Sequence, residues 1–137
     1  MDYIQIDRTN YMELILHKFP AFRTQWAEHL AAWNLPLARP IAVDVTEFAD
    51  FAVVTIGHGI DAEIDRLAEI TELMLMQDDP VIDYAFRTLF LEQISLGTKR
   101  GGVAVDRFTH KLRPLGSYHW QALDLRVGIY PSGVSID

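Results

Sequence analysis

The chain has 137 residues, 50% of them apolar, a formal net charge of −7 and no cysteine. This length suits one domain with one hydrophobic core, because two domains would each bury too little surface. The lack of cysteine excludes disulfides, thiolate metal ligands and a cysteine nucleophile, and it is typical of a cytoplasmic protein. No apolar run approaches the about 20 residues of a membrane span, and the N-terminal residues lack the pattern of a signal peptide.

The charges are unevenly distributed along the chain. Residues 44–92 contain 12 Asp and Glu against two Arg and no Lys, whereas residues 93–137 contain three acids and six bases. A negative field repels phosphate backbones and attracts basic surfaces, and it acts mainly on the rate of encounter. The pattern therefore favours a protein partner with a basic surface over nucleic acid.

The first predicted helix covers residues 10–18, with Asn10 as its cap and Glu13 reaching back in a capping-box arrangement. The second begins at Pro20 and ends before a connection at residues 34–40 that contains two prolines. Spacings of four, four and three place its apolar residues on one face. This stripe consists of Phe22, Trp26, Leu30 and Trp33.

The third predicted helix is capped by Asp44 and ends near Gly57 or Gly59. The fourth is the most regular of all, because its apolar residues fall within an arc of about 140° at 100° per residue. The residues in this arc are Ile60, Ile64, Leu67, Ile70, Thr71, Met74 and Leu75, all apolar except Thr71.

Asp79-Pro80 predicts the start of a fifth helix and Gly97 its end, followed by a loop at residues 97–102. A short helix is expected at residues 105–112. A last helix, capped by Ser117, precedes an irregular tail at residues 129–137.

We therefore predict an all-α single domain over residues 1–137, either a helical bundle or a short solenoid-like stack of about six to seven helices. The residues expected to share its core are Phe22, Trp26, Leu67, Met74, Phe86, Phe90 and Trp120.

Residues with chemical potential are present but poorly spaced for catalysis. The histidines stand singly, and the nearest mixed pair, His58 with Asp61, straddles Gly59 in a way typical of a turn. The carboxylate pairs at Asp78-Asp79 and at Asp44 with Glu47 lie at predicted helix N-termini, where capping explains them. We expect no catalytic residue, metal ion or cofactor. A small enzyme using carboxylates and His58 stays an alternative.

A basic cluster follows the acidic segment. It could contact nucleic acid, but the pI of about 5.1 favours packing against the acidic segment within the same molecule. The cluster consists of Lys99, Arg100, Arg107, Lys111 and Arg113.

The predicted partner-binding residues lie on the fourth helix. Apolar anchors bordered by acids are typical of an interface with a basic partner, whereas a purely solvating face would not need Leu73 and Met76. Solubility is an equally weighted explanation of this acidic ridge. The predicted binding set is Asp61, Asp65, Glu69, Glu72, Leu73 and Met76.

Three segments resemble a group of small bacterial helical proteins known as a domain of unknown function, some of them suspected to neighbour polymorphic toxin genes. The segments are Phe19-Pro20 with the helix of Trp26, residues 90–94 (FLEQI) and residues 115–123 (LGSYHWQAL). The resemblance implies an immunity-like role, in which the acidic ridge masks a basic toxin, and it implies no catalytic residue. A homo-oligomeric regulatory or structural module is a further alternative, and the oligomeric state stays open.

Overall fold

The computed structural model describes the backbone of residues 5–129 and the side chains of residues 5–123. All regular structure in this range is helical, which confirms the predicted all-α single domain. Of the predicted tail, Ile129 ends the last helix and residues 130–137 lie outside the described range. The elements are α1 (Tyr11–Lys18), η1 (Pro20–Phe22), α2 (Arg23–Ala32), α3 (Ile41–His58), α4 (Asp61–Leu75), α5 (Pro80–Tyr84), η2 (Ala85–Phe90), α6 (Leu91–Gly101), α7 (Asp106–Thr109) and α8 (Pro114–Ile129).

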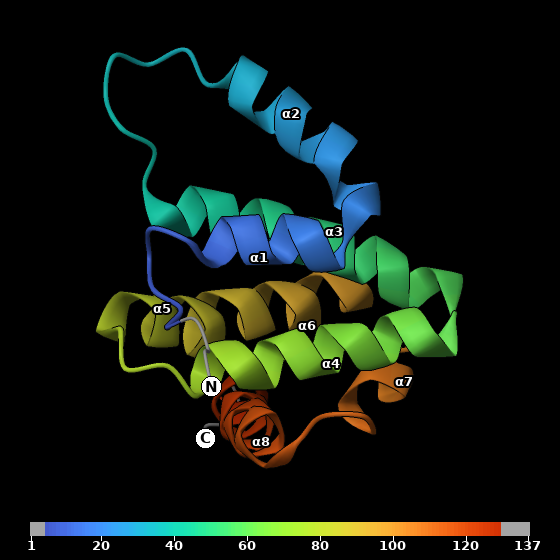
Figure 1. The fold of residues 1–137 in the computed structure, drawn as a ribbon. Helices are drawn as coiled ribbons and strands as arrows, with labels where there is room; N and C mark the ends of the chain where they lie inside the picture. Colours follow the sequence, from blue (N-terminus) through green and yellow to red (C-terminus); the bar gives the residue numbers. More distant parts are fainter. Residues whose placement is uncertain (1–4, 130–137) are drawn as a thin grey trace.

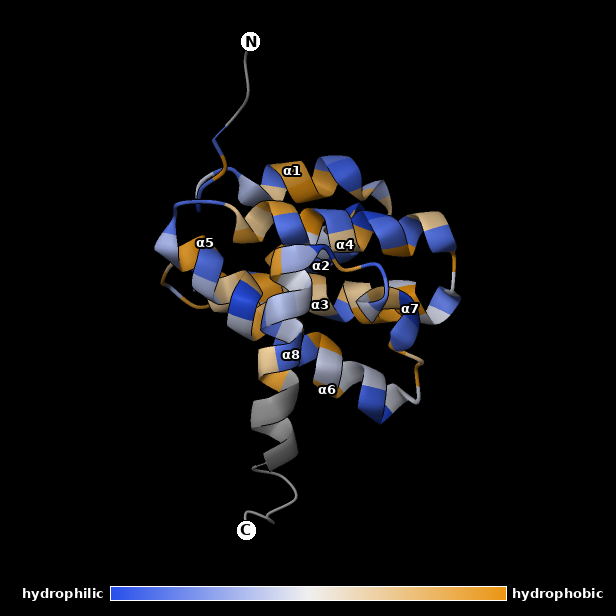
Figure 2. Cartoon of the chain, turned by 90° about the horizontal axis from the view of Figure 1, so that it is seen from below, coloured by the Kyte–Doolittle hydropathy of each residue, from blue (hydrophilic) through white to orange (hydrophobic). Residues whose placement is uncertain are grey.

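The helices form a bundle around α3 and α4. Helix α3 packs against η2, α6 and α4, while α4 also packs against α7 and α8. Figure 1 shows α8 almost end-on beneath α4, and α2 rising away from the other helices. In the view from below, hydrophobic and hydrophilic residues alternate along the helices (Figure 2), and buried hydrophobic residues of the helices form one core cluster.

The core is built on stacked phenylalanine rings. The ring of Phe48 in α3 stacks on that of Phe90, with centroids 5.3 Å apart, and lies 5.4 Å from that of Phe22. Phe90 also contacts Phe86, at 5.1 Å. Five of the seven predicted core residues are buried, and Trp26 and Trp120 pack against the core partly buried. The five buried residues are Phe22, Leu67, Met74, Phe86 and Phe90.

The predicted loop at residues 97–102 is wrong, because the helical stretch that begins at Pro80 continues to Gly101. Gly97 is a packing residue: a Cβ there would lie 2.8 Å from Cγ2 of Val53, so the missing side chain lets α6 approach α3. The helix ends at Gly101 and is capped by Gly102, whose φ of 64° is readily adopted by glycine.

The same stretch contains a π-helical segment, η2, that the sequence did not predict. A π turn adds a residue to the helical repeat and so rotates the apolar face. Phe86, Phe90 and Leu91 are all completely buried as a result.

The structure corrects the apolar stripe that was predicted for the second helix, which is η1 followed by α2. Phe22 is buried in η1 and Trp26 packs against the core, but Leu30 is 39% exposed and no residue of α2 itself is buried. The helix rises away from the other helices (Figure 1), and its later contact with α3 is made by the polar side chain of His29, so Leu30 is left partly in solvent.

The structure confirms the predicted helix cap Asp79 and corrects the predicted caps Asn10 and Asp44. Asp79 caps α5 as predicted, accepting a hydrogen bond from the backbone N–H of Val81 at 2.9 Å, with Pro80 as the first helical residue. Asn10 precedes α1 without capping it, because its Oδ1 accepts from the backbone N–H of Asp7 instead. The prediction for Asp44 is wrong: α3 begins at Ile41, and Asp44 lies inside the helix and is buried.

No helix in the described range is long and apolar enough to cross a lipid bilayer.

Replacing Phe90 by Ala should lower the free energy of unfolding by about 3–5 kcal/mol, because it removes a fully buried ring that joins η2 to α3. A urea titration of both proteins measures the difference. The matched control is Tyr118→Ala, since Tyr118 is 66% exposed and its loss should change stability little. A loss below about 1 kcal/mol at Phe90 would contradict the central place of this ring.

Acid should weaken the contact between Arg8 and Asp79. The guanidinium of Arg8 donates to both carboxylate oxygens of Asp79, at 2.8 and 3.1 Å, and chiefly this contact lowers the pKa of Asp79 from 3.8 to about 2. A pKa depressed by folding means that the stabilisation is present above about pH 4 and lost as the pH falls towards 2. Urea unfolding across this range should therefore show a steeper loss for the native protein than for Asp79→Asn. Equal slopes would contradict the assignment.

Candidate functional site

The predicted binding residues lie along one side of α4, from its first residue, Asp61, to its C-terminal cap, Met76. The side facing the bundle holds the buried residues Ile64, Leu67, Ala68, Ile70, Thr71, Met74 and Leu75. The helix thus separates an apolar face from an acidic one, as its 3.6-residue periodicity requires.

Two of the acids form ion pairs within the molecule. Lys111 Nζ lies 3.1 Å from Asp61 Oδ2, and Arg113 Nη1 lies 2.9 Å from Asp65 Oδ1. The hydrogen bond from Arg113 is the main reason that the pKa of Asp65 is lowered. Part of the basic cluster therefore packs against the acidic segment, as the low pI indicated.

A third acid, Glu72, caps the last helix. Its Oε2 accepts from the backbone N–H of Leu115 at 3.0 Å, and its Oε1 accepts from that of Gly116 at 2.8 Å. These amides belong to the first turn of α8, which begins at Pro114 and not at the predicted cap Ser117. Glu72 of α4 therefore serves as the N-terminal cap of α8, and its negative charge interacts favourably with the dipole of that helix.

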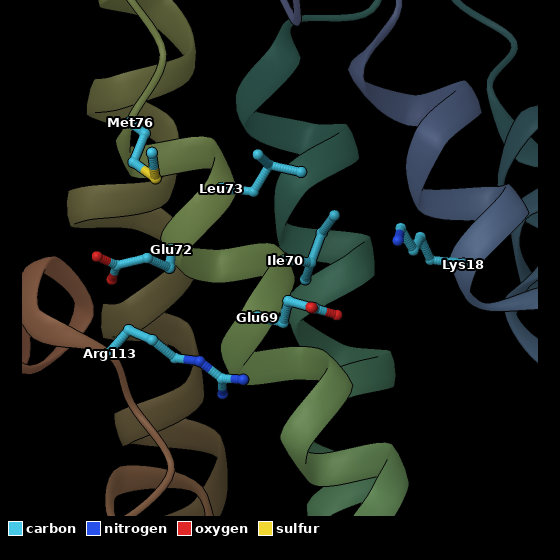
Figure 3. A pocket seen from close by; sticks show the side chains of 7 residues that line it. All are labelled: Lys18, Glu69, Ile70, Glu72, Leu73, Met76 and Arg113. Atoms are coloured by element: carbon cyan, nitrogen blue, oxygen red, sulfur yellow. The ribbon is translucent and has the colours of Figure 1, made fainter. Parts of the chain in front are cut away.

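The remaining residues border a hollow in the surface, which we call the α4 hollow. It has a volume of about 260 Å³. Figure 3 shows its lining: α4 supplies most of the side chains, Lys18 approaches from α1, and Arg113 comes from the segment before α8. The lining residues are Lys18, Glu69, Ile70, Glu72, Leu73, Met76 and Arg113.

The structure thus divides the predicted set into two parts. Glu69, Glu72, Leu73 and Met76 meet at the α4 hollow, whereas Asp61 and Asp65 do not line it and are paired with bases. Glu69 is exposed and Met76 is 62% exposed, so both are accessible to a partner.

His58, named in the enzymatic alternative, lies at the end of α3 in a different hollow of about 350 Å³. Its neighbours there include Arg107, which donates to the carbonyl oxygen of Gly59 at 2.9 Å. Within the described residues, no carboxylate lies at hydrogen-bonding distance from His58, and no group of three or more His, Asp or Glu side chains could hold a metal ion.

A different histidine meets carboxylates. His29 Nε2 in α2 lies 2.8 Å from Asp44 Oδ1, and its Nδ1 lies 3.4 Å from Glu47 Oε1. Arg39, in the connection between α2 and α3, donates to the same Asp44 at 2.9 Å and stacks over the ring of Trp26. We call Asp44, His29, Arg39 and Glu47 the α2 clamp, because these groups tie α2 and its connection to α3.

The sequence did not predict this cluster, because 15 residues separate His29 from Asp44 and no local spacing links them. One feature of the sequence could have indicated the cluster: Asp44 lies between the apolar residues Val43 and Val45 in the first turns of a helix, where its carboxylate is expected to be buried. An acid in such a place needs a partner once it is buried. A histidine between carboxylates has the groups for proton transfer, but here the His29 and Asp44 side chains are only 10% and 12% exposed and hold the fold together.

Replacing Asp44 by Ala should destabilise the protein by about 1–3 kcal/mol, because it leaves the partly buried donors of His29 and Arg39 without their acceptor. Amide exchange should rise most in α2, which has no buried residue of its own to hold it. Asp50→Ala on an exposed part of α3 is the matched control. Exchange that rises equally in all helices would show that the clamp does not act on α2 in particular.

Comparison with curated proteins and with solved structures finds no match to the chain. A family match does exist, and it spans residues 12–119, which include α2, the clamp and the whole of α4. On the strength of this match over most of its length, the chain belongs to the family described as a domain of unknown function, DUF7674.

Proposed function

We propose that this chain is a non-catalytic protein-binding domain that contacts a basic partner through the α4 hollow. The observation that carries the proposal is the position of Leu73 and Met76 beside the exposed Glu69, around a hollow on the acidic side of α4. Apolar anchors next to a rim charge are the usual composition of a protein interface.

The negative charge of this chain supports a partner with a basic surface. Asp61, Asp65 and Glu72 have partners within the molecule, so among the acids of the ridge Glu69 is the one without an ion pair or hydrogen bond in the described residues. The net charge of −7 extends the attraction beyond this one side chain and favours encounter with a basic surface.

Within this class we propose an immunity-type protein, which blocks a basic toxin or effector by covering its active site or substrate groove. The resemblance of the helical segments to proteins suspected to neighbour toxin genes supports this choice. We place the domain in the cytoplasm, in keeping with a sequence that has no cysteine.

The test begins with capture of the partner from cells of the source organism, followed by binding kinetics with the purified, identified protein at two salt concentrations. Glu69→Lys should slow association and reduce its salt dependence, because rim charges act chiefly on the on-rate. Met76→Ala should speed dissociation about fivefold or more, which is the loss of about 1 kcal/mol expected of a desolvated anchor.

The matched control is Leu35→Ala, since Leu35 is 53% exposed but lies in the connection between α2 and α3, away from α4. It should leave both rates unchanged. If Glu69→Lys and Met76→Ala also leave them unchanged, the acidic side of α4 serves solubility and the binding surface lies elsewhere.

A further inference from the structure

The α4 hollow is one half of a longer depression. On the other side of Leu73 lies a second hollow of about 630 Å³, which we call the α1 hollow. Ile6, Leu14 and Leu73 supply its apolar surface, and Asn10, Glu13 and His17 border it along α1. Leu73 and Lys18 line both hollows, so the two are continuous across these side chains.

The depression runs between two helices. Helix α1 contributes Leu14 and Lys18, and α4 contributes Ile70 and Leu73, whereas Met76 lies on the side of α4 that carries Glu72 (Figure 3). Figure 2 shows α1 and α4 side by side on the face seen from below. Two such helices leave a groove with an apolar floor, and a groove of this kind receives another amphipathic helix by its apolar side chains at spacings of three and four residues.

The acidic residues at the edges of the groove favour a positively charged occupant. Glu13 of α1 and Glu69 of α4 are both exposed, one beside each hollow. Lys18 lies half-buried between the hollows, where its aliphatic stem adds to the floor. Acids at both edges attract a helix with Lys or Arg flanking its apolar stripe, and they repel an anionic lipid surface or a nucleic acid.

We propose that the groove between α1 and α4 receives an amphipathic helix of the protein partner, with apolar side chains in both hollows and basic residues facing Glu13 and Glu69. This inference rests on the proposed function and adds to it the form of the partner and the participation of α1. The floor is Leu14, Ile70 and Leu73, and the charged edges are Glu13 and Glu69.

Two synthetic peptides of about 18 residues, or five helical turns, test the proposal directly. Both carry the same leucines at spacings of three and four, flanked by Lys in one peptide and by Glu in the other. Fluorescence polarisation with the full chain should give a dissociation constant at least tenfold lower for the Lys-flanked peptide. Amide chemical shifts of labelled protein should change in α1 and α4.

Reversing the charges at both edges of the groove is a more specific test of the proposal. The double variant Glu13→Lys, Glu69→Lys should bind the Glu-flanked peptide better than the Lys-flanked one, inverting the native preference. The control, Glu28→Lys with Asp50→Lys, makes the same change in net charge at exposed positions on α2 and α3 and should keep the native order. Leu14→Ala should weaken the Lys-flanked peptide about fivefold without changing the order.

Several results would overturn the proposal: equal binding of the two peptides, binding of neither, shift changes confined to other helices, or an inversion that the control variant also produces. Sedimentation showing that a second copy of the chain occupies the groove would overturn it as well. If Glu69→Lys and Met76→Ala weaken the native partner while Glu13→Lys and Leu14→Ala do not, the proposed function stands and the helix-binding groove fails.

Discussion

The contact on which the fold most depends is the stack of Phe48 on Phe90, at 5.3 Å between ring centroids. It joins α3 to η2, and Phe22 and Phe19 pack against the same Phe48 ring from the segment that follows α1. Elements far apart in the chain therefore meet at one side chain. Aromatic rings of this size bury a large apolar area and prefer definite geometries, so they set the positions of the helices that carry them.

The acidic residues of α4 contribute to the packing of the helical bundle. Lys111 and Arg113 pair with Asp61 and Asp65, and Glu72 caps α8, so the acids of α4 hold the C-terminal part of the bundle. Exposed pairs of this kind contribute little energy each, but they orient the connection between α7 and α8. The same pairing leaves Glu69 and Met76 accessible beside the α4 hollow, which links the packing of α8 to the surface proposed for binding.

The structure also separates two roles for polar residues on helices. The Asp44 carboxylate is buried and ties α2 to α3 through His29 and Arg39, whereas Glu69 is exposed and borders a hollow. The two carboxylates belong to neighbouring helices of similar amphipathic pattern. Their different surroundings, and not their residue type, give one a structural role and make the other a candidate for recognition.

Local signals determined what the sequence could predict. The periodicity of α4, the Asp79-Pro80 start of α5 and the apolar character of Phe86 and Phe90 act within one helical turn or two, and they are sufficient for the helical class and most of the core. Gly97 shows the limit of such signals, since a glycine that usually ends a helix here admits Val53 from α3. Its meaning depends on a neighbour more than forty positions away.

The candidate site divides in the same way. The sequence by itself placed Glu69, Leu73 and Met76 on one side of a helix, because the helical repeat decides which residues share a face. Only the tertiary structure decided that Asp61, Asp65 and Glu72 are occupied by α8 and the segment before it, that His29 meets Asp44, and that Leu73 joins two hollows between α1 and α4. Ion pairs and hollows form between segments whose separation along the chain has no fixed period, so packing alone brings them together.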